Sequence, residues 1–273
     1  MTVEDLIVYG KKYIHSHEVK MLLSHVLGYD NLELFLHLDE QVQEEDINRY
    51  KTMLKKVIDN YPIQYVLGDV NFYGREFIVN ENVLIPRFET EELVYNTLNY
   101  IRALFPKQEI DIIDLGCGSG NIGITLKKEL NSAHVTCIDI SESALLVAQE
   151  NAKRLDADIT FLKSDMLDNV NGKYNVIISN PPYISRDEEI EEIVKNYEPN
   201  SALFANNDGL YFYEKILSTC KKNLHDKFLI AFEIGATQKD KIIELANTYF
   251  QNIKVESKKD MSDNDRMIFI YNI

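Results

Sequence analysis

The sequence predicts an α/β protein in which a small helical bundle precedes a domain built on a seven-stranded, mostly parallel sheet. Three observations support this fold. The first sixty residues carry apolar side chains at helical spacing and show no strand-like alternation. From residue 110 onward, apolar runs of strand length alternate with amphipathic segments, the order that produces a parallel sheet covered by helices on both faces. Between the two parts, residues 69–79 are typical of two short strands around a glycine-containing turn.

Two helices can be placed in the N-terminal part. Apolar residues between positions 19 and 27 recur at helical spacing, and Gly28 is a stop signal, because glycine readily takes the left-handed conformation that ends helices. Residues 47–58 form a second amphipathic pattern. The apolar pattern between these two segments continues through Leu32, Phe35 and Leu36. Together these segments predict a small helical bundle.

The C-terminal part contains seven apolar runs that are short enough to be buried strands. They cover residues 110–115, 135–140, 159–162, 174–179, 228–234, 253–257 and 267–271. Amphipathic stretches at 122–130 and 144–155 are expected helices, and an acidic helix is expected from Glu89. The last two strands follow each other across a short polar loop, so we expect an antiparallel hairpin at the sheet edge.

The composition is typical of a soluble globular protein, with 273 residues of which 45% are hydrophobic and 27% charged. This length allows one large or two modest domains with an ample core. We place a helical domain at residues 1–67, a β-hairpin linker at 68–88 and the α/β domain at 89–273. The acidic start does not resemble a signal peptide, and no apolar run approaches the length of a membrane span.

The net charge of −15 argues against a broad nucleic-acid-binding surface, and a protein partner fits it more easily. Cys117, Cys137 and Cys220 are odd in number and form no C-x-x-C pair, so reduced thiols in a cytoplasmic protein are the simplest account. We expect a monomer that binds neither nucleic acid nor membrane directly. No metal site is expected, because His15 and His17 would not share a helix face.

Three glycines lie where a predicted strand meets a predicted helix, in the stretch Asp114-Leu115-Gly116-Cys117-Gly118-Ser119-Gly120. Glycines at such a junction let the backbone approach a ligand closely. The third glycine comes two residues after the second, whereas the dinucleotide-binding fingerprint has a spacing of three. The shorter G-x-G-x-G form resembles the loop of S-adenosylmethionine-dependent methyltransferases. A tight strand-to-helix turn is the alternative.

Two carboxylates follow the next two predicted strands. Asp139 is placed to accept hydrogen bonds from both hydroxyls of a ribose, as in dinucleotide-binding folds. Ser141 is the better candidate for the N-cap of the following helix, which leaves Asp139 available to a ligand. Asp165 is similarly placed to reach an adenine amino group. Either carboxylate alone could be a surface residue, but several polar motifs on successive strand ends favour a binding site.

The stretch Asn180-Pro181-Pro182-Tyr183 follows the apolar run at 174–179, at the carboxyl end of a strand, where α/β sheets place ligands. Two successive prolines make a stiff loop with free carbonyls. Carbonyls of Asn180 and Pro181 could hold both hydrogens of an –NH2 group, while Tyr183 packs against its flat group. The amide N–H of Asn180 could hold the carbonyl of the same group. The alternative is an ordinary strand-ending turn.

These motifs resemble those of the HemK/PrmC family, the release-factor glutamine N5-methyltransferases, over almost the whole chain. Besides the glycine loop, the matching stretches are Pro62-Ile63-Gln64-Tyr65-Val66-Leu67-Gly68, Asn71-Phe72-Tyr73-Gly74, Leu84-Ile85-Pro86-Arg87-Phe88-Glu89-Thr90-Glu91, Asn180-Pro181-Pro182-Tyr183-Ile184, Tyr197-Glu198-Pro199, Asp208-Gly209-Leu210 and Glu233-Ile234-Gly235. The Asn-Pro-Pro-Tyr motif alone is shared with adenine-N6 and other amino-group methyltransferases. Its combination with the Ile-Pro-Arg stretch and the helical N-terminal region points to this family.

The resemblance implies a Rossmann-like domain that transfers a methyl group from S-adenosylmethionine to the glutamine of a Gly-Gly-Gln motif in class I peptide chain release factors. It also implies that the helical domain recognises this protein substrate. The implied cofactor-binding residues are Gly116, Cys117, Gly118, Ser119, Gly120, Asp139, Asp165, Met166 and Asn180. The implied catalytic residues are Asn180, Pro181 and Tyr183. The implied substrate-binding residues are Asn180, Pro181, Pro182, Tyr183 and Arg87.

Three residues depart from the family pattern. Phe88 stands where a second proline is usual, Cys117 replaces a more usual threonine, and Met166 stands where a tryptophan is common. The wall beside the adenine is therefore expected to be aliphatic. Arg87 is one cation among several glutamates, so a structural ion pair is an alternative to substrate binding. The acidic run at 187–192 is expected to be the solvated face of a helix or an acidic docking surface.

Three other functions are weighed against this one. A glutamine methyltransferase that acts on a ribosomal protein would differ in its N-terminal domain. An adenine-N6 nucleic-acid methyltransferase would share Asn-Pro-Pro-Tyr, but the acidic charge and the lack of a basic stripe count against it. A non-catalytic release-factor-binding module is disfavoured by the intact cofactor and substrate motifs.

Overall fold

The computed structural model describes residues 1–272, and these divide into two compact units. One unit comprises Met1–Asp69 and Glu192–Tyr197, and the other comprises Val70–Glu191 together with Glu198 and the residues after it. The first division lies two residues beyond the boundary expected at residue 67, and all of the hairpin after Asp69 belongs to the second unit. No helix of residues 1–272 is both long and apolar enough to cross a membrane.

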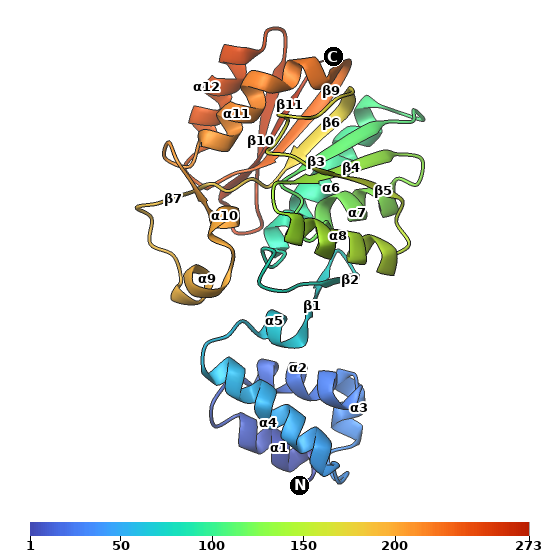
Figure 1. The fold of residues 1–273 in the computed structure, drawn as a ribbon, viewed down its shortest axis with the longest axis vertical. Coiled ribbons are helices and arrows are strands. Elements are labelled where there is room, and N and C mark those ends of the chain that lie inside the picture. The colour runs from blue at the N-terminus through green and yellow to red at the C-terminus, as the bar shows by residue number, and fades with distance from the viewer. Residues whose placement is uncertain (273) are drawn as a thin grey trace. The chain divides into compact units, whose positions relative to one another are not determined.

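The first unit is helical, as predicted. It contains α1 (Val3–Gly10), α2 (Ser16–Leu27), α3 (Asn31–Leu36), α4 (Glu44–Ile58), α5 (Ile63–Leu67) and α9 (Glu192–Tyr197) (Figure 1). Gly28 ends α2 in the left-handed conformation that the sequence predicts, with φ of 71°. The centre of its core is formed by Leu6, Leu22, Leu23, Tyr50 and Leu54.

Two details of this unit differ from the expected pattern. Leu32, Phe35 and Leu36 are all more than 60% exposed, and α3 buries only Leu34. A helix of six residues has too few turns to place a continuous apolar stripe on a core, so the apolar pattern here does not report burial. The short helix α9 comes from a distant part of the chain, and its Tyr197 ring meets the ring of Tyr61 edge-on at 5.1 Å.

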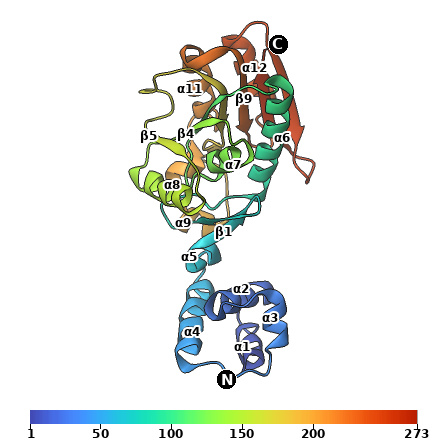
Figure 2. The ribbon, with the colours of Figure 1, turned by 90° about the vertical axis from the view of Figure 1, so that its right-hand side faces the viewer.

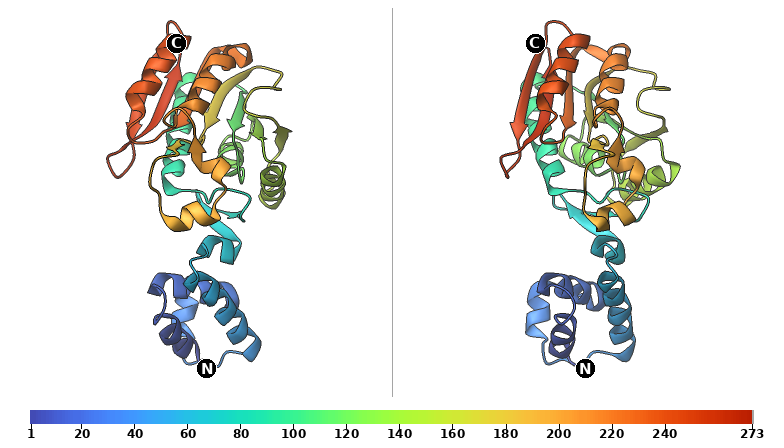
Figure 3. Two further views of the ribbon diagram at one scale, coloured as in Figure 1. Left: turned by 60° about the vertical axis from the view of Figure 1, so that its left-hand side comes forward. Right: turned by 90° about the vertical axis from the view of Figure 1, so that its left-hand side faces the viewer.

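The second unit is built on the seven-stranded sheet that the sequence predicts. Its strands are β3 (Asp111–Leu115), β4 (His134–Asp139), β5 (Ile159–Lys163), β6 (Tyr174–Ser179), β9 (Leu224–Glu233), β10 (Lys254–Lys259) and β11 (Asp265–Tyr271), in the spatial order β10-β11-β9-β6-β3-β4-β5 (Figure 1). The first five are parallel, and β11 pairs antiparallel with both β9 and β10. The expected C-terminal hairpin is confirmed, and it forms one edge of the sheet in red in Figure 3.

Helices cover both faces of this sheet (Figures 1 and 2). Alternate residues of one strand face opposite layers, so Ile112 packs in a cluster with α6 (Phe88–Leu104), α7 (Asn121–Glu129) and α8 (Glu142–Arg154). Its neighbour Ile113 packs in a second cluster with α11 (Tyr211–Thr219) and α12 (Lys239–Tyr249). The short helix η1 (Cys220–Asn223) follows α11 and leads into β9. Because β4 and β6 flank β3, the strand order reverses at β3, the position where such sheets bind ligands.

The predicted hairpin is formed by β1 (Asp69–Phe72) and β2 (Arg75–Ile78), around a turn at Gly74. It packs into the second unit, where Phe72 and Phe77 join the core on the α6 side. The side chain of Asn151 on α8 accepts from the Ile78 amide at 2.7 Å and donates to the Ser119 carbonyl at 2.9 Å. One buried amide therefore ties the hairpin to the glycine loop.

The segment after Tyr183 contains elements that the sequence pattern does not predict. Strands β7 (Ile184–Ser185) and β8 (Phe204–Ala205) pair in parallel, and α10 (Asn200–Leu203) precedes β8. The expectation of a helix at 187–192 is wrong, because residues 187–191 are turn and coil and α9 begins only at Glu192. The acidic side chains of this run are exposed, as expected of solvated charges.

Candidate active site

A cavity of about 310 Å³ opens at the carboxyl ends of the parallel strands. Each of the four strands β3, β4, β5 and β6 contributes a residue that follows its last position, and the segment from Pro199 to Phe212 supplies the opposite wall. The predicted residues that line this cavity are Gly116, Gly118, Asp139, Asp165, Met166, Asn180 and Pro182. The topology thus brings together motifs that lie more than sixty positions apart in the sequence.

The glycine loop forms part of the cavity wall from backbone atoms that no side chain covers. Gly116 and Gly118 both have positive φ, at 72° and 53°, and a Cβ added to either would meet no atom within 4 Å. These two positions therefore offer bare backbone to a ligand. Gly120 serves packing instead, because its Cβ would lie 2.8 Å from Ile124 Cδ1 and 3.2 Å from Ala148 Cβ.

Three predicted cofactor residues of this loop do not line the cavity. Cys117 is buried in the core on the α6 side, and Ser119 is buried with its hydroxyl on Asn121 Oδ1 at 3.1 Å. Gly120 begins the turn into α7. Their contribution is to shape the loop, and a direct contact of Cys117, Ser119 and Gly120 with the cofactor stays a prediction.

Asp139 lies at the end of β4 and lines the cavity. Its carboxylate accepts from the Gly118 amide at 2.9 Å and from the Ser141 amide at 2.8 Å. Ser141 caps α8 through its own hydroxyl, as predicted, which leaves the remaining lone pairs of Asp139 for a ligand. Burial raises the pKa of Asp139, so two ribose hydroxyls that donate to it would stabilise its charge.

The next strand end carries Asp165 and Met166. Asp165 forms an ion pair with Lys215 at 2.8 Å and keeps its place in the cavity wall. Met166 is buried, has a left-handed backbone with φ of 50°, and lines the cavity together with Ile140 and Phe212. The wall is thus partly aliphatic at Met166, as expected, but Phe212 adds an aromatic ring that no sequence motif indicates.

Asn180 follows β6 and lines the cavity, while its side-chain nitrogen Nδ2 donates to Thr90 Oγ1 at 3.2 Å. One of the two N–H bonds is thereby engaged by Thr90, and the expectation that this amide also holds a substrate carbonyl stays a prediction. The side-chain oxygen Oδ1 remains available as an acceptor. Just before it, Ser179 donates from Oγ to the Leu115 carbonyl at 2.6 Å, which joins the ends of β6 and β3.

Of the other three residues of the Asn-Pro-Pro-Tyr motif, only one lines the cavity. Pro182 lines the cavity, whereas Pro181 is buried and Tyr183 does not line it. The Tyr183 carbonyl accepts from Gln238 Nε2 at 2.9 Å, and burial raises the pKa of the phenol to about 12. A neutral, anchored Tyr183 fits a packing role. Contacts of Pro181 and Tyr183 with a substrate stay predictions.

Arg87 forms an ion pair with Glu198, as the alternative interpretation of this residue predicts. Glu198 is buried and also accepts from the Ile85 amide at 3.1 Å. This pair fixes the Ile-Pro-Arg stretch against the Glu198-Pro199 segment, and Leu84 and Pro199 beside it line the cavity. Arg87 thereby supports the cavity wall, and its contact with a substrate stays a prediction.

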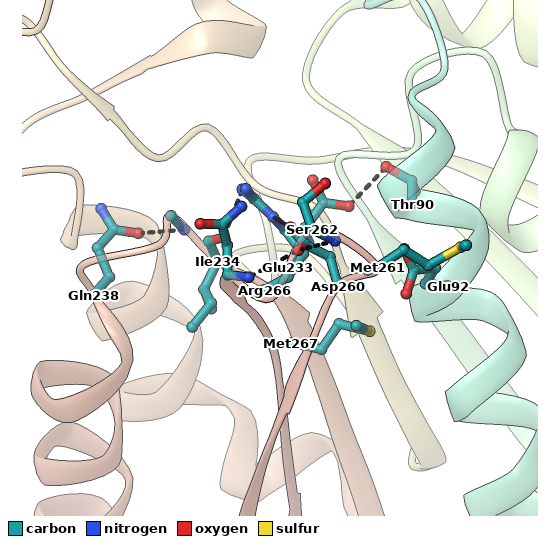
Figure 4. Close-up of polar contacts among 12 residues, drawn as sticks. Thr90, Glu92, Glu233, Ile234, Gln238, Asp260, Met261, Ser262, Arg266 and Met267 are labelled. Atoms are coloured by element: carbon teal, nitrogen blue, oxygen red, sulfur yellow. Dashed lines mark hydrogen bonds and ion pairs between the residues drawn. The ribbon is translucent and has the colours of Figure 1, made fainter.

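A buried hydrogen bond joins Thr90 and Glu233, two residues to which the sequence motifs give no role (Figure 4). Thr90 Oγ1 donates to Glu233 Oε2 at 2.7 Å, and burial raises the pKa of Glu233 to about 7. The guanidinium of Arg266 is turned to other acceptors, Asp260 Oδ2 at 3.1 Å and the Ile234 carbonyl at 3.2 Å. Both Thr90 and Glu233 lie in stretches that carry the family resemblance, which is the signal that could have identified them.

Both parts of the chain match known protein families. A family model described as the methyltransferase small domain matches residues 90–242, and one described as the PrmC N-terminal domain matches residues 14–68. The release factor glutamine methyltransferase of Bacillus cereus is 38% identical over 255 residues, which cover 92% of this chain and 90% of that protein. The protein of the same name from Clostridium botulinum is 36% identical and covers 98% of both chains.

Solved structures share the fold at low sequence identity. A methyltransferase from Pyrococcus furiosus matches with a TM-score of 0.54 and 16% identity, covering 82% of this chain and 100% of that one. The catalytic domain of hMettl16, in complex with the MAT2A 3'UTR hairpin 6, matches with a TM-score of 0.56 and 15% identity, covering 84% and 82%. These likenesses concern the α/β architecture alone.

Proposed function

Because this chain belongs to the release factor glutamine methyltransferase family, we propose that it transfers the methyl group of S-adenosylmethionine to the side-chain nitrogen of the glutamine in the Gly-Gly-Gln motif of a class I release factor. The observation that carries the proposal is the place of Asn180, whose side chain lines the same cavity as Gly116, Gly118 and Asp139. The side chain proposed to bind the substrate amide and the residues proposed to bind the cofactor thus line one cavity.

The residues present fit S-adenosylmethionine. The bare backbone at Gly116 and Gly118, the carboxylate of Asp139 and the apolar wall at Met166 suit its amino acid portion, ribose and adenine respectively. When bound, the cofactor supplies a methyl group that its sulfonium makes electrophilic. The protein residues must then bring the weakly nucleophilic amide nitrogen into line with that carbon.

Asn180 supplies the orientation. Its Oδ1 accepts one hydrogen of the substrate –NH2, and the Pro181 carbonyl is the proposed acceptor for the other. Holding the nitrogen in a near-attack position is worth about 7–11 kcal/mol where the geometry is well aligned. The same acceptors stabilise the positive charge that develops on nitrogen as the new bond forms. The product amide then loses its extra proton to solvent.

The first unit is proposed to recognise the release factor. The match of residues 14–68 to the PrmC N-terminal domain supports this role, and so does the surface of α3. That short helix exposes Leu32, Phe35 and Leu36 by 64%, 69% and 67%. Adjacent exposed apolar side chains are typical of a protein-binding surface.

The enzyme is further proposed to act as a monomer in the cytoplasm, without direct contact to nucleic acid. The net charge of −15 supports the last point. Cys117, Cys137 and Cys220 are all free and buried, which suits a reducing compartment.

Transfer of a labelled methyl group tests the proposal. The enzyme is incubated with methyl-labelled S-adenosylmethionine and, separately, with a class I release factor, the same factor carrying alanine in place of the motif glutamine, a ribosomal protein fraction, and DNA. We expect label only in the unmodified release factor. Label in the ribosomal fraction or in DNA, with none in the release factor, would contradict the proposal and favour one of the rival methyltransferases.

A further inference from the structure

Two buried residues that do not line the cavity lie beside the Asn180 amide and bear on its orientation. Thr90 lies in the first turn of α6 and Glu233 at the end of β9, and each is only 2% exposed. A threonine hydroxyl has a single proton. Since Glu233 Oε2 accepts that proton at 2.7 Å, Thr90 Oγ1 can only accept from Asn180, and it does so from Nδ2 at 3.2 Å.

The Glu233 carboxylate favours the same orientation of the Asn180 amide. Burial raises the pKa of Glu233, and Thr90 and Asn180 both oppose this rise, which places the Asn180 side chain next to the carboxyl group. A carboxylate is an acceptor only. The nitrogen end of the Asn180 amide therefore faces the hydrogen-bonded pair of Thr90 and Glu233, and its oxygen end faces the other way.

We propose that Thr90 and Glu233 are positioning residues that hold the Asn180 amide with Oδ1 toward the substrate nitrogen. This inference rests on the proposed function. A freely rotating amide would present –NH2 to the substrate –NH2 for part of the time, and two donors facing each other cannot bond. We call the chain of hydrogen bonds from Glu233 through Thr90 to Asn180 the relay. Its backbone is anchored as well, because Tyr213 donates to the Glu233 carbonyl at 2.8 Å and Ser179 to the Leu115 carbonyl at 2.6 Å.

The relay depends on the charge of Glu233. Ionised Glu233 accepts from Thr90, whereas protonated Glu233 can donate to Thr90 and release the threonine proton toward Asn180. The groups that face this carboxyl are Arg266 from β11, Glu89 from α6, Tyr183 from the loop after β6 and Tyr213 from α11. Arg266 is engaged by Asp260, and no cation among residues 1–272 bonds Glu233 directly. The Glu233 pKa of about 7 places the change of charge near neutrality.

Isosteric substitutions test the positioning role. Thr90→Val removes the hydroxyl and keeps the volume, and Thr90→Ser restores the hydroxyl. We expect Thr90→Val to lower the single-turnover methylation rate by about 10- to 100-fold, by analogy with residues that orient metal-binding side chains. Its S-adenosylmethionine affinity should be unchanged, and Thr90→Ser should recover most of the lost rate.

Thr97 on the same helix offers a matched control. It is fully buried, and its hydroxyl has no hydrogen-bond partner among residues 1–272. Thr97→Val makes the same change in the same helix and should keep the wild-type rate. A wild-type rate in Thr90→Val, or an equal loss in Thr97→Val, would overturn the inference. A wild-type enzyme that methylates no release factor would overturn the proposed function and this inference together.

Glu233→Gln gives a second test, in which Thr90 is left unchanged. The methylation rate of the wild type should fall as the pH is lowered through about 7, and this fall should be absent in Glu233→Gln, which has no proton to gain. In the enzyme without release factor, the NMR signals of the Asn180 side-chain amide should shift over the same pH range in the wild type only. Signals that do not respond to pH in the wild type would contradict the relay.

Discussion

Asp139 binds two backbone amides and still has lone pairs that face the cavity, which makes it the residue on which cofactor affinity should depend most. Asp139→Ala removes the proposed charge-assisted hydrogen bonding to the ribose, and one such bond is worth about 1.5–3 kcal/mol. We expect a loss of S-adenosylmethionine affinity of about one to two orders of magnitude, measured by calorimetry. Ser141→Ala removes the helix cap and a hydroxyl that lines the cavity but keeps the carboxylate, so it should cost much less affinity than Asp139→Ala. Equal affinity in Asp139→Ala and the wild type would refute the ribose assignment.

Asn180 should control the rate instead of cofactor affinity. Asn180→Ala removes the acceptor for the substrate amide, and loss of one preorganised polar partner lowers rates by about 10²–10³ at comparable sites. Asn180→Asp keeps an oxygen but loses the donor to Thr90 and places a second carboxylate beside Glu233. Its rate should fall too. If both variants match the wild type in single-turnover assays, Asn180 does not orient the substrate, and Asn-Pro-Pro-Tyr is an ordinary strand-ending turn.

At the scale of elements, a buried carboxyl group between β3 and α7 should make the folding stability depend on pH. Asp114 is fully buried and accepts from the Gly123 amide at 2.9 Å, while its second oxygen has no partner among residues 1–272. Burial raises its pKa to about 7 from an ordinary value of 3.8. The folded protein therefore holds this proton over a pH range in which the unfolded chain has released it.

The sign of the effect on stability follows from this difference in proton binding. Asp114 favours the folded state most below about pH 4, and this contribution is lost as the pH rises toward 7. Asp114→Asn keeps an acceptor for Gly123 and cannot ionise. We expect denaturant unfolding to show a smaller loss of stability between pH 5 and about 8 in this variant than in the wild type. Parallel pH profiles would show that Asp114 is not protonated in the folded state.

At the scale of the whole molecule, recognition of the release factor is assigned to the first unit. Phe35→Ser removes the most exposed apolar side chain of α3. We expect slower methylation of the intact release factor with unchanged S-adenosylmethionine affinity and unfolding temperature. Leu146→Ser is the control, because Leu146 is 62% exposed on α8 of the second unit. If both variants methylate the factor at the wild-type rate, α3 is not part of the recognition surface.

Much of this fold can be predicted from the sequence, because strand length, alternation with helices and glycine positions are local signals. The seven strands and the ends of α2 and β6 all follow from such signals. The side-chain partners do not, because Thr90 and Glu233 lie 143 positions apart and meet only through the sheet topology. The same holds for the ion pair of Arg87 with Glu198, which depends on how a long loop returns to the cavity.

The position of the transferred methyl group tests the central claim most directly. Tandem mass spectrometry of a class I release factor, after incubation with the enzyme and S-adenosylmethionine, can assign the added methyl to a single residue and to its side-chain nitrogen. We predict one methyl group on the glutamine of the Gly-Gly-Gln motif, present with the wild-type enzyme and nearly absent with Asn180→Ala. A methyl group on another residue, or the same yield with Asn180→Ala, would contradict the proposed reaction at this cavity.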